Sequence, residues 1–578
     1  MTILPKKIVQ ELSAYSKPNE GRLAYIRLDF SENTRGYPDF YPPGIPHEWI
    51  SAYPEYDHVT ERIGDFFDVS SDSVLLANGS DEAIAIVAQT FIEPGVDVAI
   101  VSNPCFSMFP HTLALAGAIL RAVPVKPDLS FDVAGIEKAL QDKPKLAIFA
   151  SPENPTGSML DPDIVISWCR KYPDTLIVID EAYVEFAPTT VLPRFGECDN
   201  LVVLRTFSKA WGMAGLRLGV ILAHPTLIEY MLRVRQPYNV NAMAVHTVLA
   251  LLDKKDEILA EVADIVRRRK WLAGELRKRN YRVVEGHSNS VLISLGINAE
   301  EFTDYCYKNG VLVRNRSGGA QRYTANGDNR NGNHDPLWGL VRACAGTEEE
   351  NERFLQLVDS FSERYGVIFD LDGTLVDTSQ SFDATIKELV RRHSGDILSD
   401  SELSGLRAEG GFNDDWVATS ELLKRRGINI PHAEIVKEAT ALYLEIAPKT
   451  EFPLFELELL NKISSRYRTF IVTGRARHEY DPIWSDRLCS LFHRVYCLDD
   501  LPGLKPKPSP DYLLHLKKEF DIEYGVYVGN AVDDMWAARD AGLSRIGITT
   551  TLSAETLREA GAQIVIDGLE ELEKVYSL

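Results

Sequence analysis

The stretch GVIFDLDGTLVD at residues 366–377 limits most strongly what this chain can fold into. It reads as a buried strand that delivers two aspartates, Asp370 and Asp372, into a turn that Gly373 permits. Such a strand looks like the start of a protein, yet roughly 365 residues precede it. A chain of 578 residues also exceeds what one hydrophobic core normally serves. We therefore expect at least two domains, with a new one beginning near residue 365.

The overall composition predicts a cytoplasmic protein. The formal charge of −22, from 62 basic and 84 acidic side chains, disfavours a nucleic-acid or anionic-membrane partner. Seven cysteines are dispersed without a CxxC pair, which indicates reduced thiols and not a disulfide framework or a zinc site. No stretch approaches the roughly 18 consecutive apolar residues that a membrane span needs. We therefore expect neither a nucleic-acid partner nor a membrane.

Short apolar runs alternate with helix-like stretches in the first half of the chain. Continuous apolar runs suit strands buried on both faces of a parallel sheet, so an α/β architecture is predicted. The runs are residues 73–77, 96–101, 145–150, 175–180 and 200–207. Residues 317–336, rich in Gly and Asn, are expected to form a loop or hairpin insertion. Residues 349–364 read as a helix that ends directly before the strand at 365, which predicts a short tether between two domains.

Five short motifs in the first half become specific because they occur together and in order. They are NGSDEAI (78–84), NPCF (103–106), NPTG (154–157), DEAY (180–183) and RTFSKAWGMAGLRLG (205–219). On these motifs, residues from about 20 to 360 resemble the fold-type-I, pyridoxal-phosphate-dependent aminotransferases, most of all the histidinol-phosphate aminotransferase branch. The resemblance implies residues 1–364 as this enzyme, with a large domain over about 40–245 and a small domain from 1–40 and 246–364.

The resemblance also implies which residues hold pyridoxal 5'-phosphate. Lys209 would bind the cofactor as a Schiff base and later carry the substrate's proton, and Asp180 would keep the pyridine nitrogen protonated. The cofactor phosphate is expected where a turn opens a helix. Tyr53 matches a tyrosine that the family lends to the partner subunit, which implies a homodimer. The remaining cofactor-binding positions are Gly79, Ser80, Asp81, Phe106, Asn154, Tyr183, Ser208 and Arg217.

Two arginines match the family's substrate-binding positions. Arg342 matches one that grips an acidic substrate group, and Arg314 matches a second one near the far end of the substrate. Arg316 would share that second role or be solvated, and the sequence leaves both readings open. The chain departs from the branch at SENTRG (31–36), where NENPYG is typical, and in the insertion at 317–336. Both departures fall near the expected substrate entrance.

The second half resembles the haloacid-dehalogenase superfamily over residues 365–578. After the two aspartates come Thr473 at the end of RTFIVTG (468–474) and Lys507 at the start of KPSPD, with Lys505 as a weaker candidate for the same role. The resemblance implies a Rossmann-like core over 365–378 and 467–578 and a helical cap over 379–466 that closes over the site. Within the cap, EGGFNDDW (409–416) is either a substrate-facing loop or a surface turn.

The implied chemistry of this half is phosphate-ester hydrolysis. Asp370 would attack phosphorus, Asp372 would protonate the leaving alcohol and then activate water, and Thr473 and Lys507 would stabilise the phosphoryl oxygens. A Mg²⁺ ion would offset the accumulated charge. Its expected ligands are Asp370, Asp372, Asn530, Asp533 and Asp534. Asn530 stands where the family usually has a metal-binding aspartate, so weaker metal binding is expected.

Together the two halves predict a bifunctional enzyme. The first would interconvert imidazole-acetol phosphate and L-histidinol phosphate with glutamate and 2-oxoglutarate, and the second would hydrolyse this phosphorylated amino alcohol to L-histidinol. Two alternatives stay open. The aminotransferase would act on another, aromatic or phosphonate, amino acid beside a phosphatase of different specificity, or the second half would be a non-catalytic phosphate-binding module.

Overall fold

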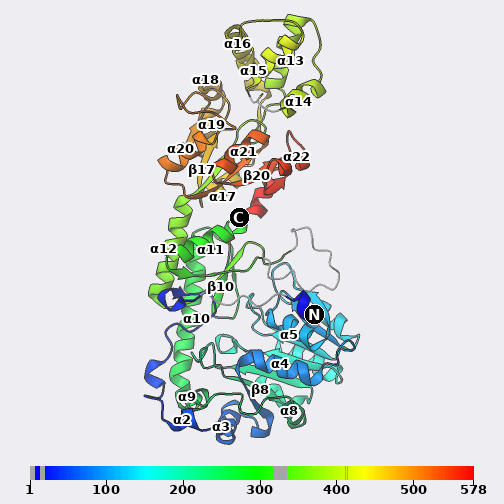
Figure 1. Ribbon diagram of the computed structural model, residues 1–578, viewed down its shortest axis with the longest axis vertical. Helices are drawn as coiled ribbons and strands as arrows, with labels where there is room; N and C mark the ends of the chain where they lie inside the picture. The colour runs from blue at the N-terminus through cyan, green and yellow to red at the C-terminus, as the bar shows by residue number, and fades with distance from the viewer. Residues whose placement is uncertain (1–6, 13–19, 318–334, 410–411, 413, 578) are drawn as a thin grey trace, which may run out of the picture. The chain divides into compact units, whose positions relative to one another are not determined.

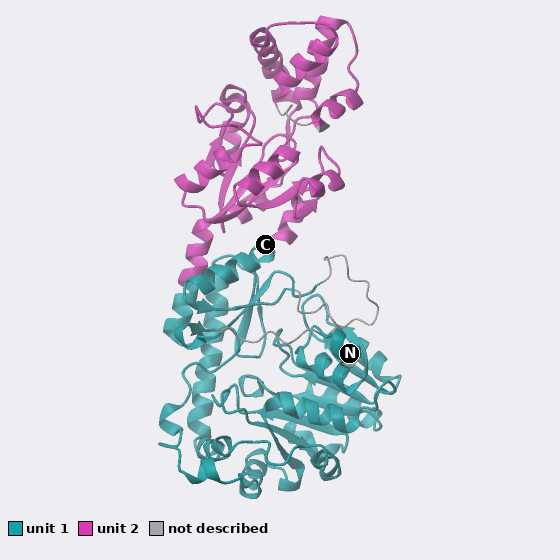
Figure 2. Ribbon diagram, in the orientation of Figure 1, with its two compact units in different colours: residues 1–355 teal, residues 356–578 magenta. Residues whose placement is uncertain are grey.

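The computed structural model describes residues 7–12, 20–317, 335–409, 412 and 414–577. The chain divides into two compact units, residues 1–355 and 356–578 (Figure 2). The division falls inside helix α12 (Glu348–Arg364), short of the boundary expected at 364/365. Most of the expected insertion at 317–336, and residues 410, 411 and 413 of the expected cap loop, lie outside the described residues.

A seven-stranded sheet forms the centre of the first unit, in the order β2-β8-β7-β6-β5-β3-β4. The five apolar runs predicted from sequence all form strands of this sheet, and only β8 runs antiparallel to its two neighbours. It reverses because no crossover helix separates it from β7, and a parallel return requires one. The strands are β2 (Val74–Ala77), β3 (Val98–Asn103), β4 (Ile119–Pro124), β5 (Leu146–Ala150), β6 (Leu176–Asp180), β7 (Leu201–Thr206) and β8 (Gly219–Ala223).

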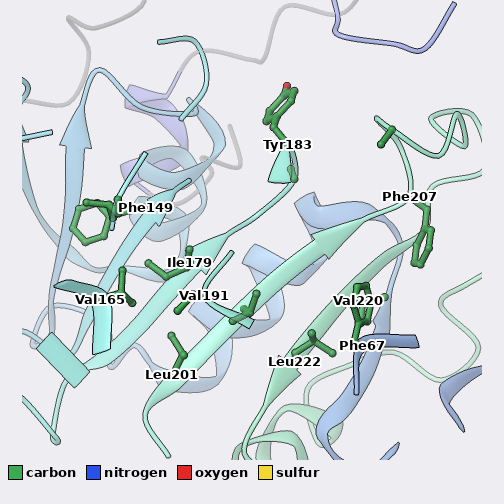
Figure 3. Close-up of a cluster of buried hydrophobic side chains, with 14 of the residues drawn as sticks. Phe67, Phe149, Val165, Ile179, Tyr183, Val191, Leu201, Phe207, Val220 and Leu222 are labelled. Carbon is green, nitrogen blue, oxygen red and sulfur yellow. The ribbon is translucent and has the colours of Figure 1, made fainter. Parts of the chain in front are cut away.

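Helices cover both faces of this sheet, which explains why β5 to β8 are buried along their whole length. One face packs against α4 (Gly79–Phe91) and α5 (Met108–Ala116). The other packs against α3 (Asp57–Phe67), α6 (Val133–Leu140) and α7 (Pro162–Lys171). Figure 3 shows side chains of this second core, among them Phe67, Phe149, Val165, Ile179, Leu201 and Leu222.

A smaller antiparallel sheet completes the first unit, in the order β12-β13-β10-β9. Its strands are β9 (Val283–Glu285), β10 (Ser290–Ser294), β12 (Arg314–Asn315) and β13 (Leu340–Cys344), in contact with helices α10 (Lys255–Lys278) and α11 (Ala299–Lys308). Helices α8 (Pro225–Leu232) and α9 (Ala242–Leu252) connect the large sheet to α10. The N-terminal strand β1 (Ile26–Arg27) pairs with β11 (Val311–Leu312), which directly precedes β12 of this smaller sheet in the chain.

The second unit is built on a six-stranded parallel sheet, in the order β18-β17-β14-β19-β20-β21. The strand predicted from GVIFD is β14 (Tyr365–Phe369), wholly buried between β17 (Arg468–Val472) and β19 (Tyr524–Gly529). The outer strands are β18 (Arg494–Tyr496), β20 (Ser544–Ile548) and β21 (Ile564–Ile566). Helices α20 (Asp511–Glu519), α21 (Val532–Asp540) and α22 (Ala554–Glu559) accompany them. Because the strands are parallel, the residues that follow β14, β17 and β19 meet at one edge.

The insertion between Asp377 and Phe452 contains four helices in its described residues, labelled α13 to α16 in Figure 1. They are α13 (Phe382–Ser394), α14 (Asp400–Ala408), α15 (Asp415–Arg425) and α16 (His432–Thr450). The chain enters and leaves the insertion through an antiparallel pair, β15 (Val376–Asp377) and β16 (Phe452–Pro453). Helix α17 (Leu457–Ser464), inside the range expected for the cap, contacts β17 of the core. In the described ranges, no helix combines the length and the apolar character needed to cross a bilayer.

Candidate active sites

Lys209 lies in the connection between β7 and β8. Its Nζ donates a hydrogen bond to the Phe30 carbonyl at 2.9 Å and lies 5.7 Å from the centre of the Tyr183 ring. Within the described part of the chain, this amine forms no ion pair with a carboxylate. A half-buried lysine held only by a carbonyl is available to react with a carbonyl compound.

Asp180 ends the buried strand β6 and is itself buried. Burial, with smaller contributions from the Asp81 and Glu181 carboxylates, raises the pKa of Asp180 to about 7, although the Ala182 N–H and Lys209 oppose the rise. The one hydrogen bond found for its side chain comes from the Ala182 N–H at 3.0 Å. Since an acid in this setting would be stabilised by a cationic partner, Asp180 fits the pyridine nitrogen of the expected cofactor.

Asn154 connects Tyr183, which lies near Lys209, to the expected substrate arginine Arg342. Its Nδ2 donates to the Tyr183 hydroxyl at 3.4 Å, and its Oδ1 accepts from Arg342 Nη1 at 2.6 Å. Arg342 Nη2 also donates to the Asp29 carbonyl. Tyr183 lies beyond the end of β6 (Figure 3). The structure therefore brings Lys209, Asn154, Tyr183 and Arg342 together.

Arg314 borders the same region from the smaller sheet. It lies directly opposite Arg342 in the pairing of β12 with β13, and its guanidinium is 5.3 Å from the centre of the Phe30 ring. The backbone carbonyl of Phe30 is the group that holds Lys209. Both expected substrate arginines thus contact the Asp29–Phe30 segment that also holds Lys209.

The start of α4 and Arg217 form a cradle suited to an anion. Gly79 begins α4 with a φ of 78°, and a Cβ at this position would lie 2.4 Å from Arg217 Nη2. Arg217 also pairs with Asp81 at 2.8 Å, while Ser80 is half-buried in the first turn. Ser208 accepts a hydrogen bond from Thr206 Oγ1 at 3.0 Å. Backbone N–H groups at a helix start and a guanidinium fit the phosphate of the expected cofactor.

Glu153 is a buried carboxyl that the sequence argument missed. Its Oε1 accepts from the N–H groups of Phe106 at 3.1 Å and Asn154 at 2.9 Å, and its Oε2 accepts from Ser102 Oγ at 3.2 Å. Burial raises the pKa of Glu153 to about 8. It therefore fixes the backbone of two expected cofactor-binding residues, and its place directly before Asn154 was the only signal in the sequence.

Tyr53 is the one expected cofactor residue that is strongly exposed, at 76%. Its ring stacks on Tyr238 with the centres 4.4 Å apart. Its service to a partner subunit stays a prediction.

The second site is organised around Lys507. Its Nζ donates to Asp370 Oδ1 at 2.7 Å, to Asp534 Oδ1 at 2.6 Å and to the Tyr527 hydroxyl at 3.0 Å. Burial opposes the charge, but the Asp370 and Asp534 carboxylates hold the pKa of Lys507 well above its usual range. Burial in turn raises the pKa of Asp370, with Lys507 opposing this effect. The lysine is thus a fixed positive charge beside the expected nucleophile.

Asp372 is held from two sides by residues that follow β17. Thr473 Oγ1 donates to its Oδ2 at 3.3 Å, and Arg475 Nε donates to its Oδ1 at 3.1 Å. Thr473 was expected here, and Arg475 was not. Its only sequence signal was a basic residue two positions after Thr473, beside the end of a buried strand.

The five expected metal ligands do not form one carboxylate cluster. Both carboxylate oxygens of Asp534 already accept hydrogen bonds from the protein. Oδ1 accepts from Lys507, and Oδ2 accepts from the N–H groups of Asn530 and Ala531 at 3.1 and 3.0 Å. Asp533 is buried at the start of α21, and burial followed by the nearby Asp534 raises its pKa. Across the described ranges, no three His, Cys, Asp or Glu side chains gather closely enough to hold a metal ion.

Oxygen ligands suited to magnesium nevertheless remain. Asn530 Nδ2 donates to Thr551 Oγ1 at 2.7 Å, which fixes the amide, and its Oδ1 lies 3.4 Å from Thr374 Oγ1. Mg²⁺ commonly takes one or two protein oxygens and completes its shell with water and substrate phosphate. Asp370 and the Asn530 amide oxygen fit this pattern, with one negative charge fewer than a pair of aspartates.

Known proteins resemble both halves of the chain. Residues 50–358 match the family Aminotransferase class I and II, and residues 367–548 match the family Haloacid dehalogenase-like hydrolase. Histidinol-phosphate aminotransferase 1 of Carboxydothermus hydrogenoformans is 30% identical over 360 residues, which are 60% of this chain and 96% of that protein. Histidinol-phosphate aminotransferase of Roseiflexus castenholzii is 37% identical over 285 residues, 47% of this chain and 75% of that protein.

A solved structure agrees with the fold. Histidinol-phosphate aminotransferase from Sinorhizobium meliloti, in complex with pyridoxal-5'-phosphate, superposes with a TM-score of 0.52 at 22% identity, over 61% of this chain and 95% of that one. At this identity the likeness concerns the fold alone. The chain therefore belongs to the class I and II aminotransferases, and it carries a haloacid dehalogenase-like hydrolase domain after the aminotransferase domain.

Proposed function

We propose that the chain is a bifunctional enzyme that makes a phosphorylated amino alcohol and then removes its phosphate. The first activity would transfer an amino group between L-histidinol phosphate and 2-oxoglutarate, or in reverse between glutamate and imidazole-acetol phosphate, with pyridoxal 5'-phosphate. The observation that carries it is that Lys209, Arg342 and Arg314 each contact one of two adjacent residues, Asp29 and Phe30. The names of the two relatives described above support this substrate.

The residues of the first site would each act at a stated atom. When bound, pyridoxal 5'-phosphate supplies an aldehyde and an electron sink for the α-carbon. Lys209 Nζ would accept the proton from the substrate's α-carbon and would donate it again later in the reaction. Asp180 would hold a protonated ring nitrogen, and Arg217 with the start of α4 would bind the phosphate. The guanidinium groups of Arg342 and Arg314 would orient the acidic ends of the two substrates.

The second site would cleave the phosphate ester in two steps. One Asp370 oxygen attacks phosphorus and forms an aspartyl-phosphate, while the P–O bond to the alcohol breaks and Asp372 gives that oxygen its proton. A water molecule then attacks the same phosphorus, Asp372 takes a proton from it, and free phosphate leaves Asp370. Lys507 and Thr473 would stabilise the phosphoryl oxygens throughout. Mg²⁺, held by Asp370 and Asn530, would offset the negative charge of the phosphate.

The assembly and location of the enzyme are part of the proposal. The stacked, exposed rings of Tyr53 and Tyr238 support a homodimer in which Tyr53 reaches the partner's cofactor. The seven cysteines are all free, which supports a reducing cytoplasm.

The direct test supplies the full chain with L-histidinol phosphate, 2-oxoglutarate, pyridoxal 5'-phosphate and Mg²⁺ and follows glutamate and free phosphate. Both products are expected, and Asp370→Asn should abolish phosphate while leaving glutamate. Glutamate formed only from an aromatic or phosphonate amino acid would point to the alternative aminotransferase. An absence of phosphate from every monoester tried would leave the second domain as a phosphate-binding module.

A further inference from the structure

We propose that Arg475 is a positioning residue that orients Asp372 and links it to both ends of the helical insertion. This inference rests on the proposed phosphatase function of the second domain. No comparison or motif assigns a role to Arg475, and its side chain is fully buried beside the partly exposed Asp372 carboxylate.

The contact between Arg475 and Asp372 fixes an orientation as well as a charge. Arg475 Nε lies 3.1 Å from Oδ1 and 3.4 Å from Oδ2 of Asp372, and Nη2 donates to Oδ1 as well. Thr473 donates to Oδ2 at 3.3 Å. A planar guanidinium that meets a carboxylate through two nitrogens restricts rotation of that carboxylate, which a lysine cannot do.

The other edge of the guanidinium binds Glu451, which is fully buried. Arg475 Nη1 donates to Glu451 Oε2 at 3.0 Å, and Nη2 donates to Oε1 at 3.1 Å. Glu451 follows α16, the last helix of the insertion. It also accepts from Ser381, the residue before the first helix α13, at 2.8 Å. One carboxylate therefore joins the two points where the chain enters and leaves the insertion.

Aromatic rings of the insertion hold the guanidinium in place. Its carbon lies 5.0 Å from the centre of the Phe382 ring and 5.6 Å from that of Tyr443. Phe382 belongs to α13 and Tyr443 to α16. Such cation–π contacts favour one fixed position of the cation when it is shielded from water.

The two carboxylates depend on Arg475 to different degrees. Without the guanidinium, Glu451 keeps three donors, namely Ser381, Tyr443 at 2.9 Å and Trp484 at 2.6 Å. Among the hydrogen bonds found for Asp372, only that from Thr473 would remain. Loss of the two-nitrogen contact from the guanidinium should therefore disturb the orientation of Asp372 far more than that of Glu451.

This asymmetry gives a kinetic signature that a merely structural role would not. Asp372 is needed to protonate a poor leaving group such as an alkoxide, whereas p-nitrophenolate leaves without a proton. The value of kcat/KM reports the steps up to departure of the leaving group. A misplaced Asp372 should therefore lower kcat/KM for an alkyl phosphate much more than for p-nitrophenyl phosphate.

The test variant is Arg475→Lys, because it retains a buried positive charge between Asp372 and Glu451 and loses only the two-nitrogen contact of the planar guanidinium. With Mg²⁺ and the full chain, we expect kcat/KM to fall about 100-fold for L-histidinol phosphate and less than about tenfold for p-nitrophenyl phosphate. Glu451→Gln keeps the shape of the side chain and should lower kcat/KM for L-histidinol phosphate about tenfold, again with a smaller loss for p-nitrophenyl phosphate. The matched control is Arg477→Lys, two residues on, where the guanidinium pairs with Asp500 at the half-exposed surface. It should leave both values within about twofold.

Equal losses for the two substrates in Arg475→Lys would overturn the proposal. A crystal structure of the same variant decides independently of activity. We expect the Asp372 carboxylate to be rotated or to occupy two conformations, with Glu451 unmoved. An unmoved Asp372 would also overturn the proposal. If the native chain hydrolyses neither ester, the proposed function fails, and the position of Asp372 in the variant still decides this inference.

Discussion

The two candidate sites surround a lysine in opposite ways. Lys209 rests against a backbone carbonyl and near an aromatic ring, and in the described residues it meets no carboxylate. Lys507 is clamped between two carboxylates, Asp370 and Asp534. The difference agrees with the roles proposed for the two lysines, since an amine that forms a bond must be able to lose its proton, while one that stabilises phosphate must keep it.

The aspartates of the two sites differ in the same sense. Asp180 is buried and raised to a pKa of about 7, with only a backbone N–H found to bond its side chain. Asp370 has its counter-charge within the protein, at 2.7 Å from Lys507. As proposed, Asp180 would receive its cationic partner from the bound cofactor, whereas Asp370 already has one in Lys507.

The largest effects are expected from a reciprocal pair of variants, each of which inactivates one site and leaves the other intact. Lys209→Ala should lower transamination about 10⁴-fold or more and leave phosphate release unchanged, because it removes only the reactive amine. Asp370→Asn should do the reverse. Both rates are measured on the full chain with L-histidinol phosphate. Loss of both activities in either variant would show that the sites are not independent.

The second prediction concerns folding stability. Lys507→Met leaves two buried carboxylates without their counter-charge and should lower the free energy of unfolding of its domain by about 3–5 kcal/mol at neutral pH. Lys209→Met removes one hydrogen bond to a carbonyl and should cost about 1 kcal/mol. Urea unfolding with a probe for each domain makes the measurement, and equal losses would contradict the comparison.

The third prediction concerns Glu153, a buried acid of the first site for which the described residues show no ion pair. Burial raises the pKa of Glu153 to about 8, so the folded state binds its proton more tightly than the unfolded state does. The resulting stability is fully present below an unfolded pKa of about 4.5 and is lost as the pH rises through about 8. Glu153→Gln should therefore remove about 3 kcal/mol of the loss between pH 5 and pH 8.

Unfolding of the first domain without cofactor, followed from pH 5 to pH 8, measures this effect. Glu197→Gln is the control, because Arg194 lowers the pKa of that exposed carboxyl and it stays ionised throughout the range. A Glu153→Gln profile parallel to that of the native chain would refute the assignment.

The smallest expected effect concerns magnesium. Asn530→Asp restores one negative charge beside Asp370 and should lower the Mg²⁺ concentration for half-maximal phosphate release about tenfold. Asn530→Ala, which removes the oxygen, should raise it. A half-saturation value unaffected by either change would place the metal elsewhere.

The features that the sequence predicted are those encoded locally. The continuous apolar run before Asp370 predicted β14, and Thr473 and Lys507 lie beside the aspartates as the motif order implied. The role of Arg475 could not be predicted, because it depends on a contact with Glu451, 24 positions earlier, which folding of the insertion brings back to the core. The same holds for Glu153, since it acts on Phe106 across 47 positions and two strands. The reversed strand β8 depended on a missing crossover helix and not on its own apolar pattern.

If the two proposed activities act in sequence, one chain converts a ketone phosphate into a free amino alcohol. The most direct measurement incubates the full chain with imidazole-acetol phosphate, glutamate, pyridoxal 5'-phosphate and Mg²⁺ and identifies the products by mass spectrometry. We expect L-histidinol with equimolar phosphate from the native chain and L-histidinol phosphate alone from Asp370→Asn. A native chain that stops at L-histidinol phosphate, or that leaves the ketone unchanged, would contradict this expectation.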